Sequence, residues 1–359
     1  MYLAAFFDQL IQYSHDLDHI PAESGQFRHD QCIALRHGVD YLQQLAFADR
    51  GFTAGRLLNE FGRLQFFGIG IRHSPELLDI RQMANFHREA GADATVAALP
   101  VPIEQARGFG VIAADANGRV REFQEKPDVP AAIPGDPGRA FASMGNYLFK
   151  TEVLVEALRE TGKRQRHDFG QHVLPDLLRT RSLYAYDYSC NKVPGTSSYE
   201  EPAYWRDVGT IESYFSAHQD VLGLKPRFDV FNPRWPIYSK TYQGPVAKII
   251  GGEIENSLIA GGSVVNNATL RNSIIRHEVM IEQDVVLEDC IVMDNVRIRK
   301  GARLRRVIVD RYNDIKRNAR IGYDPEVDRQ HYTVSSSGIV VIPRVHKQSA
   351  RVSYWPGQG

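Results

Sequence analysis

The last third of the chain places apolar residues at a fixed spacing. Between residues 258 and 321, the steps from one apolar position to the next are six, six and five residues, a cycle of 17 residues that repeats. These positions are Leu258, Val264, Leu270, Ile275, Ile281, Leu287, Val292, Ile298, Leu304, Val309, Ile315 and Ile321. A helical period cannot produce these steps, whereas a coil of three short strands with one inward aliphatic side chain each can. The pattern predicts a left-handed parallel β-helix, and a β-sandwich is the alternative.

Residues 77 to about 225 alternate strand and helix patterns instead. Strand patterns fall at residues 95–101, 110–114, 120–123, 144–149 and 183–188. Helix patterns lie between them, one ending near Gly91 and others at residues 152–160 and 173–179, and a further helix begins near Ile211. Asn117-Gly118 is typical of a hairpin turn. This order predicts an α/β sheet, in which binding residues gather at strand ends and loops.

The first 76 residues show weaker signals. Apolar residues recur at helical spacing over residues 2–13, which predicts an amphipathic helix. His15 and His19 lie four residues apart among acidic residues. We interpret them as part of a solvated face, and a metal-binding pair is the alternative. The two glycines within residues 51–57 favour a flexible loop over a phosphate cradle, because no apolar strand precedes them.

Composition narrows the class of protein. The chain has 359 residues, enough for two domains, and its 43 basic residues balance 43 acidic ones. This balance gives no reason to expect nucleic acid or an anionic membrane as a partner. Cys32, Cys190 and Cys290 stand apart, so the sequence predicts neither a disulfide framework nor a zinc ribbon. No apolar run reaches membrane-spanning length and residues 1–7 lack a basic signal-peptide start, so we expect a cytoplasmic protein.

Residues 109–145 carry side chains suited to a phosphorylated sugar. Gly110 begins a strand and, because it has no Cβ, lets a ligand approach the backbone closely. Glu125 can accept hydrogen bonds from sugar hydroxyls, and Lys126 is a point charge suited to a phosphate. Ser143 adds a small hydroxyl on a later strand. Together these residues predict a sugar-phosphate site.

Asp207 is a candidate metal ligand. It precedes the helix that begins near Ile211, in the tight aromatic and glycine context of residues 204–210. A carboxylate there can ligate a divalent cation. The alternatives are that Asp207 caps the helix or pairs with Arg206, and spacing alone favours them.

Several uncommon motifs follow one another between residues 79 and 225. They are Gly91-Ala92-Asp93-Ala94-Thr95-Val96, Pro100-Val101-Pro102-Ile103-Glu104, Phe109-Gly110-Val111, Glu122-Phe123-Gln124-Glu125-Lys126-Pro127, Ala142-Ser143-Met144-Gly145-Asn146-Tyr147, His167-Asp168-Phe169-Gly170 and Tyr204-Trp205-Arg206-Asp207-Val208-Gly209-Thr210. In this order they resemble the second half of the catalytic domain of bacterial glucose-1-phosphate adenylyltransferase, or ADP-glucose pyrophosphorylase. The resemblance implies an incomplete nucleotidyltransferase domain, with a Rossmann-like mixed sheet, followed by the left-handed β-helix.

The resemblance also implies roles for individual residues. Gly110, Glu125, Lys126 and Ser143 would contact glucose 1-phosphate, with Lys126 and Asp207 as the catalytic residues. Asp207 would ligate Mg²⁺. In that family the sugar phosphate attacks the α-phosphate of ATP, which releases pyrophosphate and forms ADP-glucose for glycogen biosynthesis. Mg²⁺ offsets the phosphate charge in such reactions.

The sequence departs from the family in the nucleotide half of the site. The family's Gly-Gly-x-Gly-Thr-Arg-Leu loop, which holds the nucleotide triphosphate, and its Trp-Tyr-x-Gly-Thr-Ala-Asp-Ala segment do not occur here. Arg72-His73-Ser74 stands where the family has a Gly-Asp-His metal motif, and residues 1–75 are short for the βα units they would replace. The departures raise two hypotheses, a catalytically silent subunit or a rearranged gene with a replaced start. A non-catalytic regulatory or assembly partner of a complete homologue is thus the main rival to an active enzyme.

The resemblance divides the chain into five parts. These are an unmatched segment at residues 1–76, a partial nucleotidyltransferase domain at 77–227, a linker at 228–252, the β-helix at 253–344 and a tail at 345–359. In the family the β-helix contributes to subunit contacts and effector binding. We therefore expect a homo-oligomer or a complex with a complete homologue.

Two sets of residues on the β-helix are functional candidates. A basic cluster comprises Arg297, Arg299, Lys300, Arg303, Arg305 and Arg306. Within it, Arg305 and Arg306 are candidates for binding an anionic sugar-phosphate effector, and a solvated face is the alternative. Some β-helix modules are acyltransferases that use a histidine between coils, and His277 is the candidate here. No insertion interrupts the spacing around His277, so we interpret it as solvated.

Overall fold

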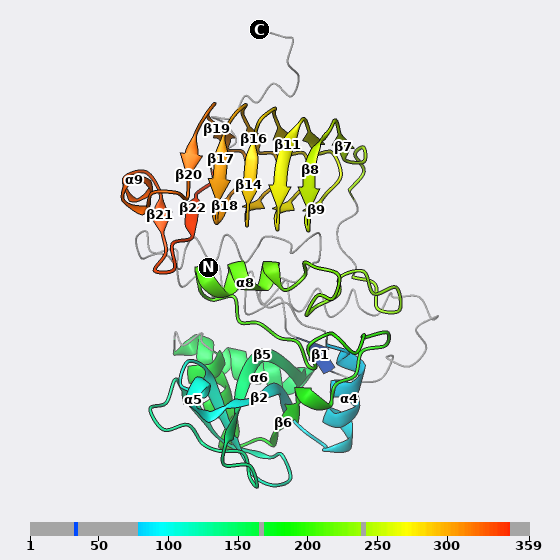
Figure 1. Ribbon diagram of the computed structural model, residues 1–359. Coiled ribbons are helices and arrows are strands. Elements are labelled where there is room, and N and C mark those ends of the chain that lie inside the picture. The colour runs from blue at the N-terminus through cyan, green and yellow to red at the C-terminus, as the bar shows by residue number, and fades with distance from the viewer. Residues whose placement is uncertain (1–31, 35–77, 165–168, 238–241, 345–359) are drawn as a thin grey trace. The chain divides into compact units, whose positions relative to one another are not determined.

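In the computed structural model, residues 32–34, 78–164, 169–237 and 242–344 are described, and they belong to two units (Figure 1). The first unit contains residues 78–192 and the short strand at 32–34, and the second contains residues 193–344. The predictions for residues 2–13, His15, His19, residues 51–57 and residues 72–74 lie outside the described residues, as does His167-Asp168. Within the described residues, no helix has both the length and the apolar character needed to cross a membrane.

A mixed sheet is the centre of the first unit, which confirms the predicted α/β sheet. Its strands are β1 (Cys32–Ala34), β2 (Ala94–Pro102), β3 (Gly110–Ala114), β4 (Val120–Glu125), β5 (Arg139–Lys150) and β6 (Leu183–Asp187). Their order is β4-β3-β5-β2-β6, and β1 pairs with the last residues of β5. Among the described strands of this sheet, only β2 and β6 pair in parallel. β5 begins at Arg139, before the predicted start at residue 144, so Ser143 and Gly145 lie within one strand.

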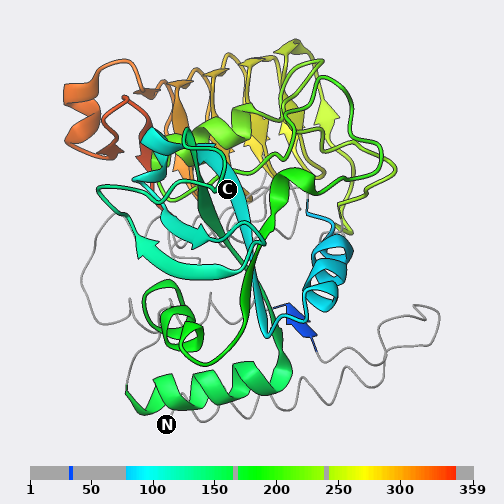
Figure 2. The ribbon, with the colours of Figure 1, turned by 90° about the horizontal axis from the view of Figure 1, so that it is seen from below.

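Helices flank this sheet. They are α4 (Ile80–Glu89), α5 (Ile103–Ala106), α6 (Thr151–Lys163) and α7 (Leu174–Leu178), with a π-helical turn η2 (Phe169–Val173) before α7 and a 3₁₀ turn η3 (Tyr188–Cys190) after β6. α4 packs against β2 and β6, and α6 packs against β5 (Figure 2). α4 begins where the carboxylate of Asp79 accepts a hydrogen bond from the backbone N–H of Arg81, and it buries Met83 and His87.

The second half of β5 is anchored in the core of the first unit. Phe149 is fully buried, and Tyr147 stacks on Phe169 with ring centroids 5.8 Å apart. Val153 and Leu154 of α6 cover this region from the outside. The first half of β5, which carries Ser143, lies beyond an irregularity at Gly145 (φ 73°), and its pairing with β2 and β3 holds it in the sheet.

The second unit is built around a three-sided parallel β-helix, as the apolar spacing predicts (Figure 1). Its first sheet contains β7 (Lys248–Ile249), β10 (Val264–Val265), β13 (Met280–Ile281), β16 (Arg297–Ile298) and β19 (Asp314–Ile315). Its second sheet contains β8 (Gly252–Glu255), β11 (Ala268–Arg271), β14 (Val286–Glu288), β17 (Arg303–Arg305) and β20 (Arg320–Ile321). Its third sheet contains β9 (Leu258–Ile259), β12 (Ile274–Ile275), β15 (Ile291–Val292), β18 (Val307–Val309), β22 (Val340–Ile342) and the antiparallel β21 (Thr333–Val334).

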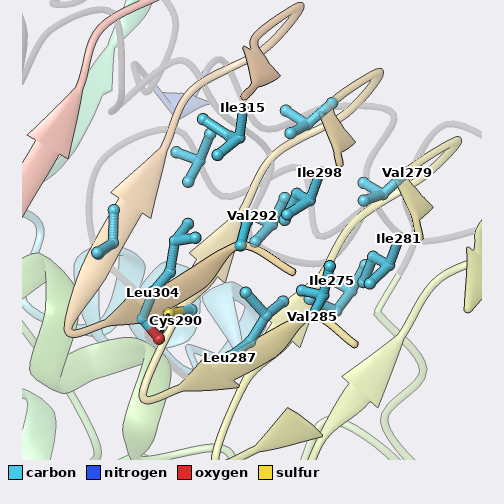
Figure 3. Close-up of a cluster of buried hydrophobic side chains, with 14 of the residues drawn as sticks. Ile275, Val279, Ile281, Val285, Leu287, Cys290, Val292, Ile298, Leu304 and Ile315 are labelled. Atoms are coloured by element: carbon cyan, nitrogen blue, oxygen red, sulfur yellow. Dashed lines mark hydrogen bonds between the residues drawn. The ribbon is translucent and has the colours of Figure 1, made fainter. Parts of the chain in front are cut away.

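Inward aliphatic side chains from the three sheets fill the β-helix. Figure 3 shows Ile281 and Ile298 stacked in successive coils, with Leu287 and Leu304 of the second sheet beside them. These side chains are fully buried. Each buried leucine or isoleucine side chain is worth about 1.5–3 kcal/mol relative to an exposed one. The stack therefore supplies most of the apolar burial of this unit.

The predicted inward positions Leu258 and Val264 are wrong by one residue. Val265, which is fully buried, pairs with Ile281, whereas Val264 pairs with Met280 and is partly exposed. Ile259, likewise, pairs with the buried Ile275. The coil that contains Val265 is one residue shorter than the next coil. Val265 and Thr269 are four positions apart in the sequence, whereas their strand partners Ile281 and Val286 are five positions apart. Strand partners are therefore 16 residues apart up to the pair Val265–Ile281 and 17 residues apart from the pair Thr269–Val286 onward.

Residues with positive φ form the corners between the sheets. Asn256, Asn272 and Asp289 occupy equivalent corners of successive coils, with φ of 44°, 47° and 51°. Asn256 Nδ2 donates to Asn272 Oδ1 at 2.7 Å, and Asn272 Nδ2 donates to Asp289 Oδ1 at 3.2 Å. Asparagine and aspartate tolerate this backbone region better than most residues, so they suit each tight corner.

Two helices complete the second unit. Residues Ile211–Gln219 form α8, whose Tyr214 and Phe215 pack on Ile291 and Ile308 of the third sheet and on Met293, which follows β15. Residues Pro325–Arg329 form α9, which is capped by Asp324 and lies between β20 and β21. This insertion ends the regular spacing after Ile321, so β18 pairs directly with β22.

Candidate functional site

Three of the predicted sugar-phosphate residues meet on adjacent strands of the first unit. Gly110 pairs with Glu125 across β3 and β4, and Val111 pairs with Ala142, which brings Ser143 beside Gly110. A Cβ placed on Gly110 would lie 3.3 Å from Oε2 of Glu125 and 3.8 Å from Cβ of Ser143. The side chains of Glu125 and Ser143 therefore flank the bare backbone of Gly110 on one face of the sheet.

Lys126 follows directly after β4 in a left-handed backbone conformation. Its φ is 45°, and its backbone N–H donates to the carbonyl oxygen of Phe109 at 3.1 Å. A non-glycine residue with this φ costs about 1 kcal/mol or more, and such residues are enriched at functional sites. The hydrogen bond holds the backbone of Lys126 next to the residue that precedes Gly110. The Lys126 side chain is exposed and can reach a ligand.

This arrangement offers complementary chemistry for a phosphorylated sugar. The exposed carboxylate of Glu125 can accept hydrogen bonds from hydroxyl groups, and the half-buried hydroxyl of Ser143 can donate or accept. The ammonium of Lys126 can pair with a phosphate. Gly110 leaves room between them for the ligand.

Asp207 belongs to the second unit, and it neither caps the helix that follows it nor pairs with Arg206. Thr210, not Asp207, caps α8, because the hydroxyl of Thr210 accepts from the backbone N–H of Ser213 in a capping box. Arg206 pairs with Glu201 and Asp220 instead of Asp207. Both alternative interpretations of Asp207 are therefore wrong.

The carboxylate of Asp207 remains open. It is exposed, and it accepts a hydrogen bond from the backbone N–H of Gly209 at 3.2 Å through Oδ1. Among the described residues, no cation lies within ion-pair distance of it. The described residues also include no group of three or more His, Cys, Asp and Glu side chains that could hold a metal ion. One open carboxylate still fits Mg²⁺, which usually keeps several waters and takes one or two carboxylates together with substrate phosphates.

The basic cluster of the β-helix separates into paired and unpaired residues. Arg297 pairs with Glu282 at 2.7 Å, Arg299 with Asp314 at 2.6 Å and Lys300 with Asp284 at 3.3 Å. In contrast, Arg303 and Arg305 point outward from β17 and take part in no ion pair with a described residue. Half of the cluster is therefore neutralised, and its open positive charge lies on Arg303 and Arg305 of β17 and on the adjacent Arg306.

The two effector candidates, Arg305 and Arg306, have different surroundings. Arg305 is exposed on β17. Arg306 is at a corner with φ of 53°, its guanidinium lies 5.6 Å from the ring centroid of Phe215, and its Nη2 donates to the carbonyl oxygen of Ser337 at 3.3 Å. Arg306 therefore contributes to the packing of α8 on the β-helix.

His277 is half-buried rather than solvated. Its Nδ1 lies 3.2 Å from the carbonyl oxygen of Gly261, and its ring stacks on Tyr242 with centroids 4.4 Å apart. Its backbone N–H donates to the carboxylate of Asp294 at 3.2 Å. These contacts account for His277 as a structural residue of the β-helix.

Sequence reasoning missed the ion pairs beside Asp207. Glu201 and Asp220 approach Arg206 from positions five residues before it and fourteen residues after it, so helical spacing does not indicate them. The signal that was available is the density of charged and aromatic residues between residues 199 and 229.

Comparison with known proteins gives matches over both units. Residues 71–223 match the family model described as nucleotidyl transferase, and residues 245–342 match the one described as GlmU-like, C-terminal hexapeptide. The glucose-1-phosphate adenylyltransferase of Thermodesulfovibrio yellowstonii is 45% identical over 303 residues, which cover 81% of this chain and 73% of the relative. The corresponding protein of an Anaeromyxobacter species is 40% identical over 278 residues, 74% of this chain and 67% of the relative. Glucose-1-phosphate adenylyltransferase 1 of Vibrio parahaemolyticus is 39% identical over 286 residues, 77% of this chain and 68% of the relative.

Proposed function

The chain belongs to the glucose-1-phosphate adenylyltransferase family, and from this premise we propose that its first unit binds glucose 1-phosphate. The observation that carries the proposal is the convergence of Glu125 and Ser143 on either side of Gly110. A ligand held there has its hydroxyls near a carboxylate and its phosphate within reach of the flexible Lys126 side chain.

In adenylyl transfer, an oxygen of the sugar phosphate attacks the α-phosphorus of ATP. The bond from that phosphorus to the bridging oxygen of the β-phosphate breaks, and pyrophosphate leaves as ADP-glucose forms. The role we assign to Lys126 is to offset the charge of the attacking phosphate, while Glu125 orients the sugar. Mg²⁺ would supply charge neutralisation in this reaction. By the family resemblance Asp207, whose carboxylate is open, is the residue that would ligate it.

A second candidate function is a sugar-phosphate-binding subunit that does not itself turn over. The observation in its favour is that the family's Gly-Gly-x-Gly-Thr-Arg-Leu nucleotide loop does not occur in the 359 residues. Such a subunit would bind glucose 1-phosphate and associate with a complete homologue.

Titration of the full chain with glucose 1-phosphate by calorimetry tests the proposal. We expect E125Q to weaken binding about tenfold, which corresponds to the loss of one hydrogen bond to a charged group. E122Q is the matched control, because Glu122 is exposed on the same strand but alternates to the other face of β4. Failure of the unmodified chain to bind glucose 1-phosphate at millimolar concentration would overturn the proposal.

Addition of ATP and Mg²⁺ separates the two candidate functions. Release of pyrophosphate together with ADP-glucose would identify an active adenylyltransferase. Binding of glucose 1-phosphate without either product would identify the non-catalytic subunit.

We also propose that the open positive charge on β17 binds an anionic sugar-phosphate effector. The support is that Arg303 and Arg305 face outward there, while Arg297, Arg299 and Lys300 are neutralised by carboxylates.

A further inference from the structure

The loop after β4 leaves the sheet at Lys126 and returns to it five residues later. Its tip is exposed, and Val129 there is 82% exposed. The chain comes back at Pro130, which is buried. Ala131 follows and packs against the small apolar cluster that contains Val111 and Ala142. The returning end of the loop is therefore held by the same unit that carries the sugar-phosphate residues.

One side-chain hydrogen bond closes this loop. The backbone N–H of Ala131 donates to Oε1 of Gln124 at 3.0 Å. Gln124 is partly buried and pairs with Val111, so its side chain lies on the face of β4 opposite to that of Glu125. Gln124 thus binds the returning chain on one face of the strand, while the neighbouring Glu125 flanks Gly110 on the other.

Lys126 lies inside the closed loop in a backbone conformation that needs support. Its φ is 45°, although a residue that precedes a proline, here Pro127, prefers extended backbone. Such a conformation costs free energy and persists only where the surrounding contacts hold it. On one side, the N–H of Lys126 donates to the carbonyl oxygen of Phe109 at 3.1 Å. On the other side, the bond between Ala131 and Gln124 limits how far the loop can open.

We propose that Gln124 is a positioning residue that closes the loop after β4 and holds the backbone of Lys126, so that the Lys126 ammonium meets the phosphate of a sugar phosphate bound at Gly110. This inference rests on the role assigned to Lys126 under the proposed function. The backbone conformation of a residue limits the rotamers of its side chain, so relaxation of Lys126 to extended backbone would redirect the ammonium. Because a lysine side chain is flexible, the expected loss of affinity is partial.

Three variants isolate the hydrogen bond. Q124M keeps the length of the side chain and removes the acceptor. Q124E keeps an oxygen that can accept from the N–H of Ala131. Q105M is the matched control for the substitution itself, because Gln105 is exposed on α5 of the same unit.

The first measurement is amide hydrogen exchange of the full chain, read by mass spectrometry at single-residue resolution. The prolines at positions 127 and 130 carry no amide hydrogen, which simplifies the signal of this loop. We expect the amides of both Lys126 and Ala131 to exchange about fivefold faster in Q124M, as for the loss of one neutral hydrogen bond. Exchange should stay within twofold of the unmodified chain in Q124E and Q105M.

The next turn of the chain provides an internal reference. There the N–H of Ile133 donates to the carbonyl oxygen of Arg139 at 2.9 Å, and its exchange should not change in Q124M. Faster exchange at Ala131 alone would overturn the inference, because Gln124 would then close the loop without holding Lys126. An equal increase at Ile133 would also overturn it, since the effect would be a general loosening of the unit.

The second measurement is calorimetric titration with glucose 1-phosphate. We expect Q124M to bind about fivefold more weakly, and Q105M to bind as the unmodified chain does. If Gln124 acts through Lys126, the double variant Q124M/K126A binds no more weakly than K126A. The affinity of Q124M should also fall less steeply with added salt, because the charge of Lys126 contributes less to binding. Additive losses, or an unchanged salt dependence, would contradict the inference.

Failure of this inference and failure of the proposed function give different results. If the unmodified chain does not bind glucose 1-phosphate, the proposed function fails, and the role of Gln124 toward the phosphate fails with it. If the unmodified chain and Q124M bind glucose 1-phosphate equally well, the inference about Gln124 alone fails.

Discussion

The Cα of Gly110 faces the carboxylate of Glu125 so closely that a single added carbon would lie 3.3 Å from Oε2. The backbone of Gly110 is not in the left-handed region, so alanine meets no backbone strain there. The consequence of adding a methyl group is therefore local. It would occupy the space between Glu125 and Ser143.

For this reason we predict that G110A weakens glucose 1-phosphate binding about tenfold, because displacement of the Glu125 carboxylate costs one charged hydrogen bond. The melting temperature should change little. G108A is the control, since a Cβ on Gly108 would meet only the carbonyl oxygen of Gln105, at an ordinary 3.7 Å. Calorimetric titration of both variants tests the prediction, and equal affinities would contradict it.

Stability should fall as the pH falls from about 6.5 to about 4. Burial lowers the pKa of His218 to about 4, and the nearby positive charge of Arg276 adds to this. The unfolded chain binds a proton on this histidine below about 6.5 while the folded chain does not, so acid favours the unfolded state, by up to about 3 kcal/mol.

Urea unfolding at pH 7.5 and pH 5 measures this effect. H218Q cannot titrate and should lose part of the pH dependence, whereas H331Q, at an exposed histidine, should keep it. Identical pH dependence in H218Q and the unmodified protein would exclude His218 as the cause.

α8 should unfold together with the β-helix. F215A removes a ring that is 7% exposed and packs with Ile291 and Met293, so we expect a loss of about 3 kcal/mol. Thermal unfolding should show one transition at a lower temperature for this unit. L224A is the control, because Leu224 is 93% exposed. A stability of F215A equal to that of L224A would contradict the packing.

Replacement of both Arg305 and Arg306 by alanine should abolish binding of fructose bisphosphate. The single variants should differ, because R305A removes an outward charge while R306A mainly loosens the contact with Phe215. R299A is the control, since Arg299 is already paired with Asp314. Equal losses of affinity in R305A and R299A would show that net charge, not the surface of β17, attracts the anion.

The two described free cysteines should differ in reactivity. Burial inside the β-helix raises the pKa of Cys290 to about 12, whereas Cys190 is exposed. A thiol reagent at pH 8 should therefore label Cys190 in the folded protein and Cys290 only after denaturation. Mass spectrometry of the labelled peptides gives the result, and rapid labelling of Cys290 without unfolding would contradict the fold.

The β-helix could be predicted because its inward positions recur many times and each is set by the same requirement for burial. The error at Val264 arose because Val264 and Val265 are both apolar, so the pattern alone does not distinguish them. Pairing with Ile281 decides between the two valines, and pairing is a property of the folded coil.

The candidate site was predictable where it depends on local chemistry and not where it depends on distant contacts. Gly110 and Glu125 were identified from their residue types, and pairing of β3 with β4 brings them together. The surroundings of Asp207 could not be predicted. Arg206 pairs with Glu201 and Asp220, which lie at different distances from it in the sequence, and not with the adjacent Asp207. Helix capping by Thr210 instead of Asp207 is likewise decided by the backbone conformation of the turn.

The shortened corner at Asn267 has a consequence for how this chain can change in length. One residue fewer between Val265 and Thr269 leaves the stacking of both strands on the next coil intact. The strands keep the same pairing from coil to coil, and a difference in coil length is confined to the corners. Insertions and deletions of single residues should therefore be tolerated at corners and rejected within strands, where one residue would turn the aliphatic side chains outward.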